Sequence, residues 1–248
     1  MTVPILSVEN VSKRFGGVVA NDAVSLAVPE GAIVGLIGPN GSGKSTLFGS
    51  IVGFHPVDGG SVRFRGEEIS RYRVPKIARM GLVRTFQQTH IYGQMSCLAN
   101  MLISVPQRHE RFLATFRRPR GEERDRAESL LASVGLWEKR ALMAGELSFG
   151  QQKLLEFAMA LMCEPKLLLL DEPTAGINPT LINGLVAQLR RANAELGITL
   201  LVIEHNMRVI MNLADHLYCM AHGRILAQGS AEEIRTDQRV IDAYLGAQ

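Results

Sequence analysis

The amino-acid sequence predicts an α/β fold with a mainly parallel β-sheet into which a helical subdomain is inserted. Residues 167–170 and 199–203 are unbroken apolar runs, which is the pattern of parallel strands buried on both faces. Helical patterns over 180–195 and 207–213 separate and follow these strands, as expected where strands and helices alternate. From about residue 96 to 162, apolar side chains recur at helical spacing without intervening strands. This middle block is therefore expected to be an insertion in the α/β core.

The first part of the chain predicts strands of another kind. Residues 3–9 and 23–28 alternate apolar and polar side chains, and residues 61–64 continue this pattern. Turn-rich stretches at 14–17 and 58–60 separate the three segments. Strands of this type bury only one face.

The helical block contains two apolar stripes and a charged stretch. The stripes consist of Leu98, Met101 and Leu102, and of Ala127, Leu130, Leu131 and Val134. Between them, residues 107–126 are rich in Arg and acidic residues, with two Phe interspersed. Such a stretch is either a basic patch or a solvated hairpin or loop, and mixed charge favours the second interpretation.

Composition excludes several classes of protein. A chain of 248 residues can form one domain, or a core with one subdomain. The formal charge of +3 is too small to indicate a nucleic-acid partner. No apolar run reaches the ~18 residues that span a bilayer, and residues 1–5 lack the pattern of a signal peptide. Cys97, Cys163 and Cys219 are far apart, which predicts buried free thiols in a cytosolic protein.

A phosphate-binding loop is the most specific local pattern. Residues 38–45 fit the pattern G-x-x-x-x-G-K-[ST], between an apolar strand at 32–37 and a helix start at 46–52. A chance match is expected in roughly 1% of chains this long. The residues expected to hold the phosphates of ATP are Gly38, Pro39, Asn40, Gly41, Ser42, Gly43, Lys44, Ser45 and Thr46. Together with the sheet, they predict a P-loop NTPase core.

The chemistry of this loop follows from its residue types. Glycines let several N–H groups point at phosphate oxygens. The helix N-terminus adds partial positive charge, and Lys44 adds a full one. The hydroxyl of Ser45 suits Mg²⁺, which prefers oxygen ligands.

Two adjacent carboxylates predict a hydrolytic centre. Asp171 and Glu172 follow the strand at 167–170, and the carboxyl ends of strands are where open α/β sheets bind ligands. Because side chains alternate along a strand, the two acids serve different purposes. We expect Asp171 to support Mg²⁺ and Glu172 to act as the general base toward water.

A capping box precedes these carboxylates. Ser148 and Gln151 have the S-x-x-Q spacing that starts a helix, and an apolar stripe from 154 to 162 follows. By itself, this pattern predicts only the start of a core helix.

The segment 147–152, about 20 residues before 167–172, resembles the signature sequence of ATP-binding cassette (ABC) ATPases. With the loop at 38–45, the order and spacing of all three motifs match that family over essentially the whole chain. The resemblance implies a single ABC ATPase domain over 1–248. Residues 1–87 and 164–248 would form the nucleotide-binding core with an antiparallel β subdomain, and 88–163 would form the helical subdomain.

The resemblance also implies a head-to-tail dimer with two ATP molecules between its subunits. Ser148, Gly150 and Gln151 would then face the ATP that the other subunit's phosphate loop holds. Phe149 departs from the family's commoner glycine, so its ring is expected to point away from the phosphate.

Further site residues follow from the resemblance. Phe15 matches the aromatic residue that stacks on adenine, although a lone Phe more often belongs to a core. Gln87, after a short strand at 83–86, resembles the glutamine that contacts Mg²⁺ and the attacking water; Gln88 is a competitor. His205 matches the switch histidine that contacts the γ-phosphate.

One more segment of the family crosses the dimer interface. It corresponds to residues 175–178, where Asn178 replaces the more usual aspartate.

The resemblance implies partners as well. Residues 89–95 and the helix after Ser96 match the groove that receives a helix of a transmembrane permease subunit. The chain would work at the cytoplasmic face of the cell membrane, as a homodimer or with a paralogous ATPase subunit. A periplasmic or extracellular solute-binding protein would act indirectly, and no nucleic acid is expected.

Five segments together look like the ATPase subunits of branched-chain (hydrophobic) amino acid uptake systems: 84–87, 107–126, 175–179, 203–207 and 243–246. Urea and amide importers are close relatives, and lipid-exporting or non-transport cassettes are further alternatives. A DNA or ribosome factor would carry a coiled-coil insertion or a second cassette, which this chain lacks.

Overall fold

A six-stranded sheet forms the centre of the computed structural model, which describes residues 3–85, 91–105 and 121–245. Its strand order is β10-β9-β3-β8-β7-β6. All neighbouring pairs are parallel except β9 and β10, which are antiparallel. The strands are β3 (Ile33–Ile37), β6 (Leu82–Arg84), β7 (Leu167–Asp171), β8 (Thr199–Ile203), β9 (His216–Ala221) and β10 (Arg224–Gly229). The predicted parallel core is therefore present.

A second sheet of four strands is entirely antiparallel, with the order β2-β1-β4-β5. Its strands are β1 (Pro4–Phe15), β2 (Val18–Pro29), β4 (Gly59–Phe64) and β5 (Glu67–Glu68). The described helices are α1 (Lys44–Ile51), α2 (Val74–Arg79), α3 (Cys97–Ile103), α4 (Gly121–Ser133), α5 (Phe149–Met162), α6 (Pro179–Leu196), α7 (Met207–Leu213), α8 (Ala231–Thr236) and α9 (Gln238–Leu245).

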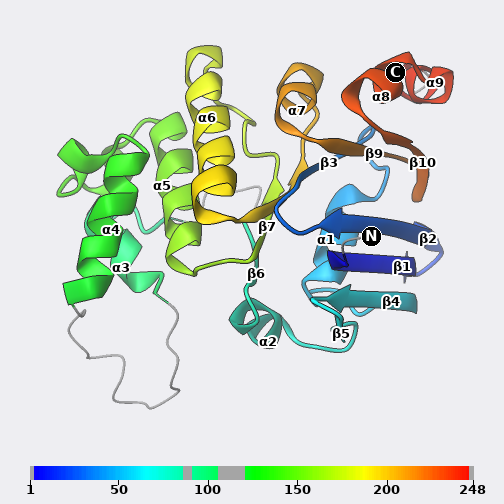
Figure 1. The fold of residues 1–248 in the computed structure, drawn as a ribbon, viewed down its shortest axis with the longest axis horizontal. Coiled ribbons are helices and arrows are strands. Elements are labelled where there is room, and N and C mark those ends of the chain that lie inside the picture. The colour runs from blue at the N-terminus through cyan, green and yellow to red at the C-terminus, as the bar shows by residue number, and fades with distance from the viewer. Residues whose placement is uncertain (1–2, 86–90, 106–120, 246–248) are drawn as a thin grey trace.

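The helices α3, α4 and α5 lie on the side of the molecule opposite to the antiparallel strands (Figure 1). Helix α6 lies between them and the strands of the parallel sheet in this view. The first part of the charged stretch 107–126 lies outside the described residues, and its last part forms the start of α4.

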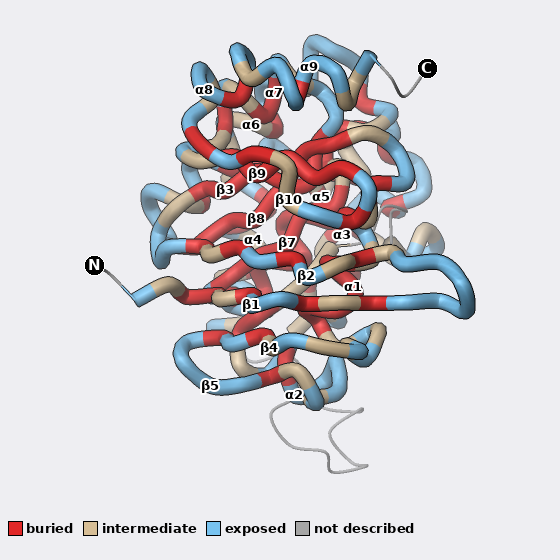
Figure 2. The backbone as a smooth tube through the Cα atoms, turned by 90° about the vertical axis from the view of Figure 1, so that its right-hand side faces the viewer, coloured by how far each residue is buried: buried red, intermediate tan, exposed pale blue. Residues whose placement is uncertain are grey.

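Two hydrophobic clusters cover the two faces of the parallel sheet. In β7, Leu168 and Leu170 belong to the cluster with α3 to α6, whereas Leu167 and Leu169 belong to the cluster with α1 and the antiparallel sheet. This alternation explains why the strand is apolar at every position. Figure 2 shows the central strands within the buried part of the molecule and an exposed turn between β1 and β2.

Most predicted elements are present, and the structure extends or corrects several of them. Strand β1 continues through Arg14 and Phe15, which had been expected in a turn. The turn is only Gly16 and Gly17, because antiparallel pairing with β2 continues up to Phe15 and Val18. The predicted strand at 83–86 is β6, which begins one residue earlier and ends at Arg84, before the described residue Thr85. Strands β9 and β10 were missed, because their sequences show no clear alternation.

Candidate nucleotide-binding and hydrolysis site

The phosphate loop connects β3 to α1, as predicted. Lys44 is the first residue of α1, and Gly43 is its N-cap with φ 101°. The Lys44 ammonium donates to the carbonyl oxygens of Gly38 (2.9 Å) and Pro39 (2.9 Å), and to Ser42 Oγ (3.3 Å). The charge is thus held over the loop, where a phosphate would meet it together with the free N–H groups of the first helical turn.

Two nearby carboxylates influence the pKa of Lys44. Burial lowers the pKa of Lys44 from its ordinary value, while the charges of Glu172 and Asp171 oppose that shift. The two predicted acids therefore lie close enough to the loop for their charges to act on it.

Two glycines of the loop are required by close contacts. A Cβ on Gly38 would lie 2.1 Å from the carbonyl oxygen of Met220, and one on Gly43 would lie 2.2 Å from that of Ala20. Gly41 has φ 78° and no atom within 4 Å of its ideal Cβ position, so this part of the loop is open. The contacts hold the loop against β2 and β9 and leave one side free for a ligand.

Asn21 also holds the loop, and sequence reasoning missed it. This buried residue of β2 donates from Nδ2 to the carbonyl oxygen of Gly43 at 3.0 Å. The interaction joins residues 22 positions apart, so only a conspicuous polar residue in an otherwise alternating strand could have indicated it.

The carboxylate of Asp171 has one partner on a neighbouring strand. Its Oδ2 lies 2.6 Å from an amino nitrogen of Arg84, at the end of β6, and its side chain is 1% exposed. Asp171 Oδ1 is buried and has no hydrogen-bond partner among the described residues. One oxygen is therefore held by Arg84, and the other is available to a cation.

Glu172 and His205 meet at the carboxyl ends of β7 and β8. His205 Nε2 lies 2.8 Å from Glu172 Oε2, and the two side chains are 41% and 12% exposed. Glu172 has φ 53°, an uncommon conformation for a residue with a side chain, of the kind that clusters at functional sites. The strand order thus brings the predicted base and the predicted switch histidine together.

A buried carboxylate, Glu204, was not predicted. Its Oε1 accepts from the backbone N–H of Thr174 at 2.9 Å and also from the Thr174 hydroxyl. Its Oε2 accepts from the N–H of Asn206 at 3.2 Å. Glu204 therefore ties the loop after Glu172 to the segment that carries His205.

The predicted capping box is present at the start of α5. Ser148 Oγ accepts from the Gln151 N–H at 3.4 Å, and the Gln151 side chain accepts from the Ser148 N–H at 3.2 Å. Helix α5 packs on the face of the parallel sheet opposite to α1, and Figure 1 shows the two helices apart. Within one chain, the structure therefore does not bring the signature segment to the phosphate loop.

Asn178 has a local role in this structure. It is the N-cap of α6 and accepts from the N–H of Thr180 at 3.0 Å.

Phe15 lies at the end of β1 and is 45% exposed. Its ring meets the His55 ring edge-to-face at a centroid distance of 5.1 Å, and the Lys13 ammonium lies 5.3 Å from its centre. A half-exposed ring of this kind is free to stack on a base.

Gln87 and Gln88 lie outside the described residues. Thr85, the last described residue before them, donates its N–H to the Leu169 carbonyl at 2.9 Å and therefore lies beside β7.

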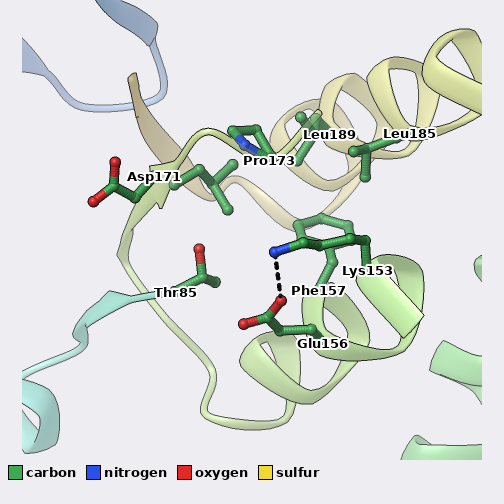
Figure 3. A pocket seen from close by; sticks show the side chains of 9 residues that line it. Thr85, Lys153, Glu156, Phe157, Asp171, Pro173, Leu185 and Leu189 are labelled. Carbon is green, nitrogen blue, oxygen red and sulfur yellow. Dashed lines mark hydrogen bonds and ion pairs between the residues drawn. The ribbon is translucent and has the colours of Figure 1, made fainter. Parts of the chain in front are cut away.

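A small cavity lies between α5, α6 and β7. Its volume is about 20 Å³, room for about one water molecule and not for a nucleotide. Figure 3 shows the ion pair of Lys153 and Glu156 at its edge and the Asp171 carboxylate pointing away from that pair. This cavity is therefore too small to be the nucleotide site.

The thiols are free, as expected, but only two of the three are buried. Cys97 and Cys219 are buried, Cys163 is partly buried, and all three are free. Burial raises the pKa of each thiol, that of Cys219 to about 11.

Among the described residues, no group of three His, Cys, Asp or Glu side chains could hold a metal ion, and no described helix is long and apolar enough to cross a membrane.

A phosphate loop between β3 and α1, with an acid and a histidine at the ends of β7 and β8, defines a nucleotide-hydrolysing protein of the P-loop class. The ABC transporter family model matches residues 21–175, and a model of the branched-chain amino acid ATP-binding cassette transporter matches residues 224–248. The chain belongs to the ABC transporter family. Within such a transporter it is the subunit that hydrolyses ATP.

Similar proteins cover almost the entire chain. It is 41% identical over 254 residues to the high-affinity branched-chain amino acid transport ATP-binding protein BraF of Pseudomonas aeruginosa, which covers 99% of both chains. It is 38% identical to LivG of Escherichia coli, described in the same words, again over 99% of both. The ADP conformation of the cassette MJ1267 is 37% identical with a TM-score of 0.89, covering 99% of this chain and 100% of that one. A nucleotide-free cassette is also 37% identical, with a TM-score of 0.87 and coverages of 98% and 99%.

Proposed function

We propose that this chain is the ATP-hydrolysing subunit of an importer for branched-chain amino acids. The observation that carries the solute class is the match of residues 224–248 to the branched-chain amino acid cassette model. The full-length identity to BraF and LivG supports it. Urea or amide import, lipid export and non-transport functions have no comparable support.

The geometry of the two strand ends supports the roles that we assign to Glu172 and His205 in hydrolysis. Glu172 accepts a proton from the attacking water, while His205, 2.8 Å away, orients the carboxylate and reaches the γ-phosphate. Lys44 exchanges the carbonyl oxygens of Gly38 and Pro39 for phosphate oxygens. The water oxygen bonds to the γ-phosphorus, the bond to the bridging oxygen breaks, and ADP and phosphate leave.

The residues at hand fit a magnesium ion. Asp171 Oδ1 is buried without a partner among the described residues, and Ser45 is exposed in the first turn of α1. Both are the hard oxygen ligands that Mg²⁺ prefers, and Gln87 is the third residue we assign to it. When bound, Mg²⁺ neutralises charge on the phosphoryl oxygens.

The adenine and the remaining phosphate contacts complete the ATP site. Phe15 stacks on the base, and the loop from Gly38 to Thr46 holds the phosphates. The site is completed by a second cassette, identical or paralogous, whose Ser148, Gly150 and Gln151 face the γ-phosphate. Ser148 and the α5 N-terminus are suited to an anion, and the sheet separates them from the phosphate loop of their own chain.

We assign residues 1–87 and 164–248 to the nucleotide-binding core and 88–163 to the helical subdomain of one domain. The segment 89–95, of which residues 89 and 90 lie outside the described residues, would together with the following helix α3 receive a permease helix at the cytoplasmic face of the membrane. A solute-binding protein would act through the permease, and no nucleic acid takes part.

Reconstitution tests this function. The chain is co-expressed and co-purified with candidate permease subunits of a branched-chain amino acid importer, placed in proteoliposomes with the solute-binding protein, and supplied with MgATP. We expect leucine, isoleucine or valine to stimulate ATP hydrolysis and to accumulate inside, and the Glu172→Gln variant to abolish both. Stimulation by urea or an amide alone would contradict the proposed solute.

A further inference from the structure

Phe149, the first residue of α5, lies against a loop of its own chain. The ring contacts Gly176 so closely that a Cβ there would lie 2.9 Å from Cε1 of Phe149. Gly176 also has φ 72°, a conformation that side chains disfavour. The loop is therefore shaped to receive this ring.

The next residue of α5 packs in the same direction. A Cβ on Gly150 would lie 2.8 Å from Cδ1 of Leu181 and 3.5 Å from Cγ2 of Ile177. Ile177 belongs to the hydrophobic core. Two consecutive residues of the signature segment therefore contact the loop 174–178 and the first turn of α6.

A buried ion pair lies beside the Phe149 ring. The ammonium of Lys153, one helical turn further along α5, is 5.8 Å from the ring centre and 3.3 Å from Glu156 Oε2. The Lys153 and Glu156 side chains are only 5% and 10% exposed, and the pair lines the same small cavity as Pro173 (Figure 3). A cation over an aromatic face favours one orientation of the ring.

The other end of the loop is tied to the hydrolytic residues. Thr174 donates its N–H and hydroxyl to Glu204, and Glu204 directly precedes His205, the partner of Glu172. The ring of Phe149 is thus linked to the base by its contact with Gly176, by the short loop from Gly176 back to Thr174, and by the contacts of Glu204 and His205.

We propose that Phe149 is a positioning residue that fastens the signature helix to the loop 174–178 of the same subunit. The orientation of α5 toward the other subunit and the placement of Glu172 and His205 then change together. This inference rests on the proposed dimeric ATPase. Its physical basis is that packed elements shift as units, so contacts at one end of a loop bias the other end.

Hydrogen exchange on the nucleotide-free chain tests the contact without a second subunit. The N–H groups of Ala175 and Ile177 bond to the carbonyl oxygens of Glu172 and Thr174. In Phe149→Gly we expect both amides to exchange about three- to tenfold faster, and Phe149→Leu to restore most of the protection. Leu196→Ala is the matched control, because Leu196 is similarly exposed at the far end of α6 and should leave both rates unchanged.

Turnover of the assembled transporter gives the second readout. We expect Phe149→Gly to lower kcat about three- to tenfold with little change in the KM for ATP or in Tm, and Phe149→Leu to recover most of it. Wild-type exchange rates or wild-type kcat in Phe149→Gly would overturn the proposal, because it requires both effects.

The same experiments separate this inference from the proposed function. If the wild-type chain neither hydrolyses ATP nor dimerises with it, the proposed function itself fails. If the wild type does both and Phe149→Gly behaves like the wild type, only the role of Phe149 fails.

Discussion

Arg84 and Asp171, which are 87 positions apart, form an ion pair of 2.6 Å between the ends of two neighbouring strands. The pair occupies one oxygen of the carboxylate that we assign to Mg²⁺, and it leaves the other oxygen without a partner among the described residues. Arg84 thereby fixes one oxygen of the carboxylate whose charge also acts on Lys44 of the phosphate loop.

Arg84→Met should lower the free energy of unfolding by about 3 kcal/mol, because it leaves the buried Asp171 charge unpaired. Urea unfolding measures this change. Arg191→Met is the matched control: its pair with Glu195 is about half exposed on both sides, so its loss should cost less than about 0.5 kcal/mol. If both variants lost the same free energy of unfolding, the buried pair of Arg84 and Asp171 would stabilise the fold no more than an exposed pair does.

Glu172→Gln should retain ATP binding and lose turnover about 10²- to 10⁴-fold, because the amide cannot accept the proton of the attacking water. Binding of a fluorescent ATP analogue and release of phosphate measure the two properties. Glu232→Gln, a largely exposed glutamate of α8, is the control and should leave both unchanged. Near-normal turnover in Glu172→Gln would exclude this residue as the base.

Asn21→Ala should weaken ATP binding several-fold, by about 1 kcal/mol, because the Gly43 carbonyl loses the side-chain donor that holds the phosphate loop. Asn193→Ala is the matched control. Its Nδ2 donates to the backbone carbonyls of Gly31 and Ile198, away from the loop. Asn193→Ala should reduce stability to a similar extent without changing the Kd for ATP. An equal loss of ATP affinity in both variants would mean that reduced stability, and not the contact with Gly43, weakens binding.

Ser148→Ala should separate capping from dimer formation. Ser148 and Ser230 are both N-caps of complete capping boxes, so either change to Ala should cost about 1 kcal/mol of stability. Only Ser148→Ala should also weaken ATP-driven dimer formation, because only Ser148 is assigned to the ATP of the other subunit. Size-exclusion chromatography in the Glu172→Gln background measures the dimer, and equal dimer formation in both variants would contradict this assignment.

Stability should decrease at alkaline pH partly through Cys219. Burial raises the pKa of this thiol from 9.0 to about 11 in the folded chain, so between these values the folded state retains a proton that the unfolded state loses. Its stabilising contribution, about 3 kcal/mol, is complete below pH 9 and is lost as pH rises through 11. In urea unfolding between pH 8 and 10.5, Cys219→Ala should show a shallower decrease than the wild type; parallel decreases would contradict the assignment.

Local patterns in the sequence predicted much of the site. The phosphate loop, the capping box of Ser148 and the strands β7 and β8 each depend on residues within a few positions of one another, so their spacing is visible in the chain. The antiparallel pair of β9 and β10 was missed, because its buried and half-buried side chains do not alternate regularly.

Contacts between distant residues could not be predicted in the same way. Asn21 with Gly43, Arg84 with Asp171, and Thr174 with Glu204 each join different strands or loops. Each depends on the order of strands in the sheets, which no local pattern specifies.

By itself, the sequence determined that this chain holds a triphosphate and carries an acid at the end of a buried strand, because glycine spacing, strand burial and helix capping act over short stretches of chain. The tertiary structure decided which side chains meet. Parallel pairing of β7 with β8 brings Glu172 to His205, and the position of β6 beside β7 brings Arg84 to Asp171. It also decided that Phe149 packs on Gly176, because a ring finds its contact only after both segments are folded.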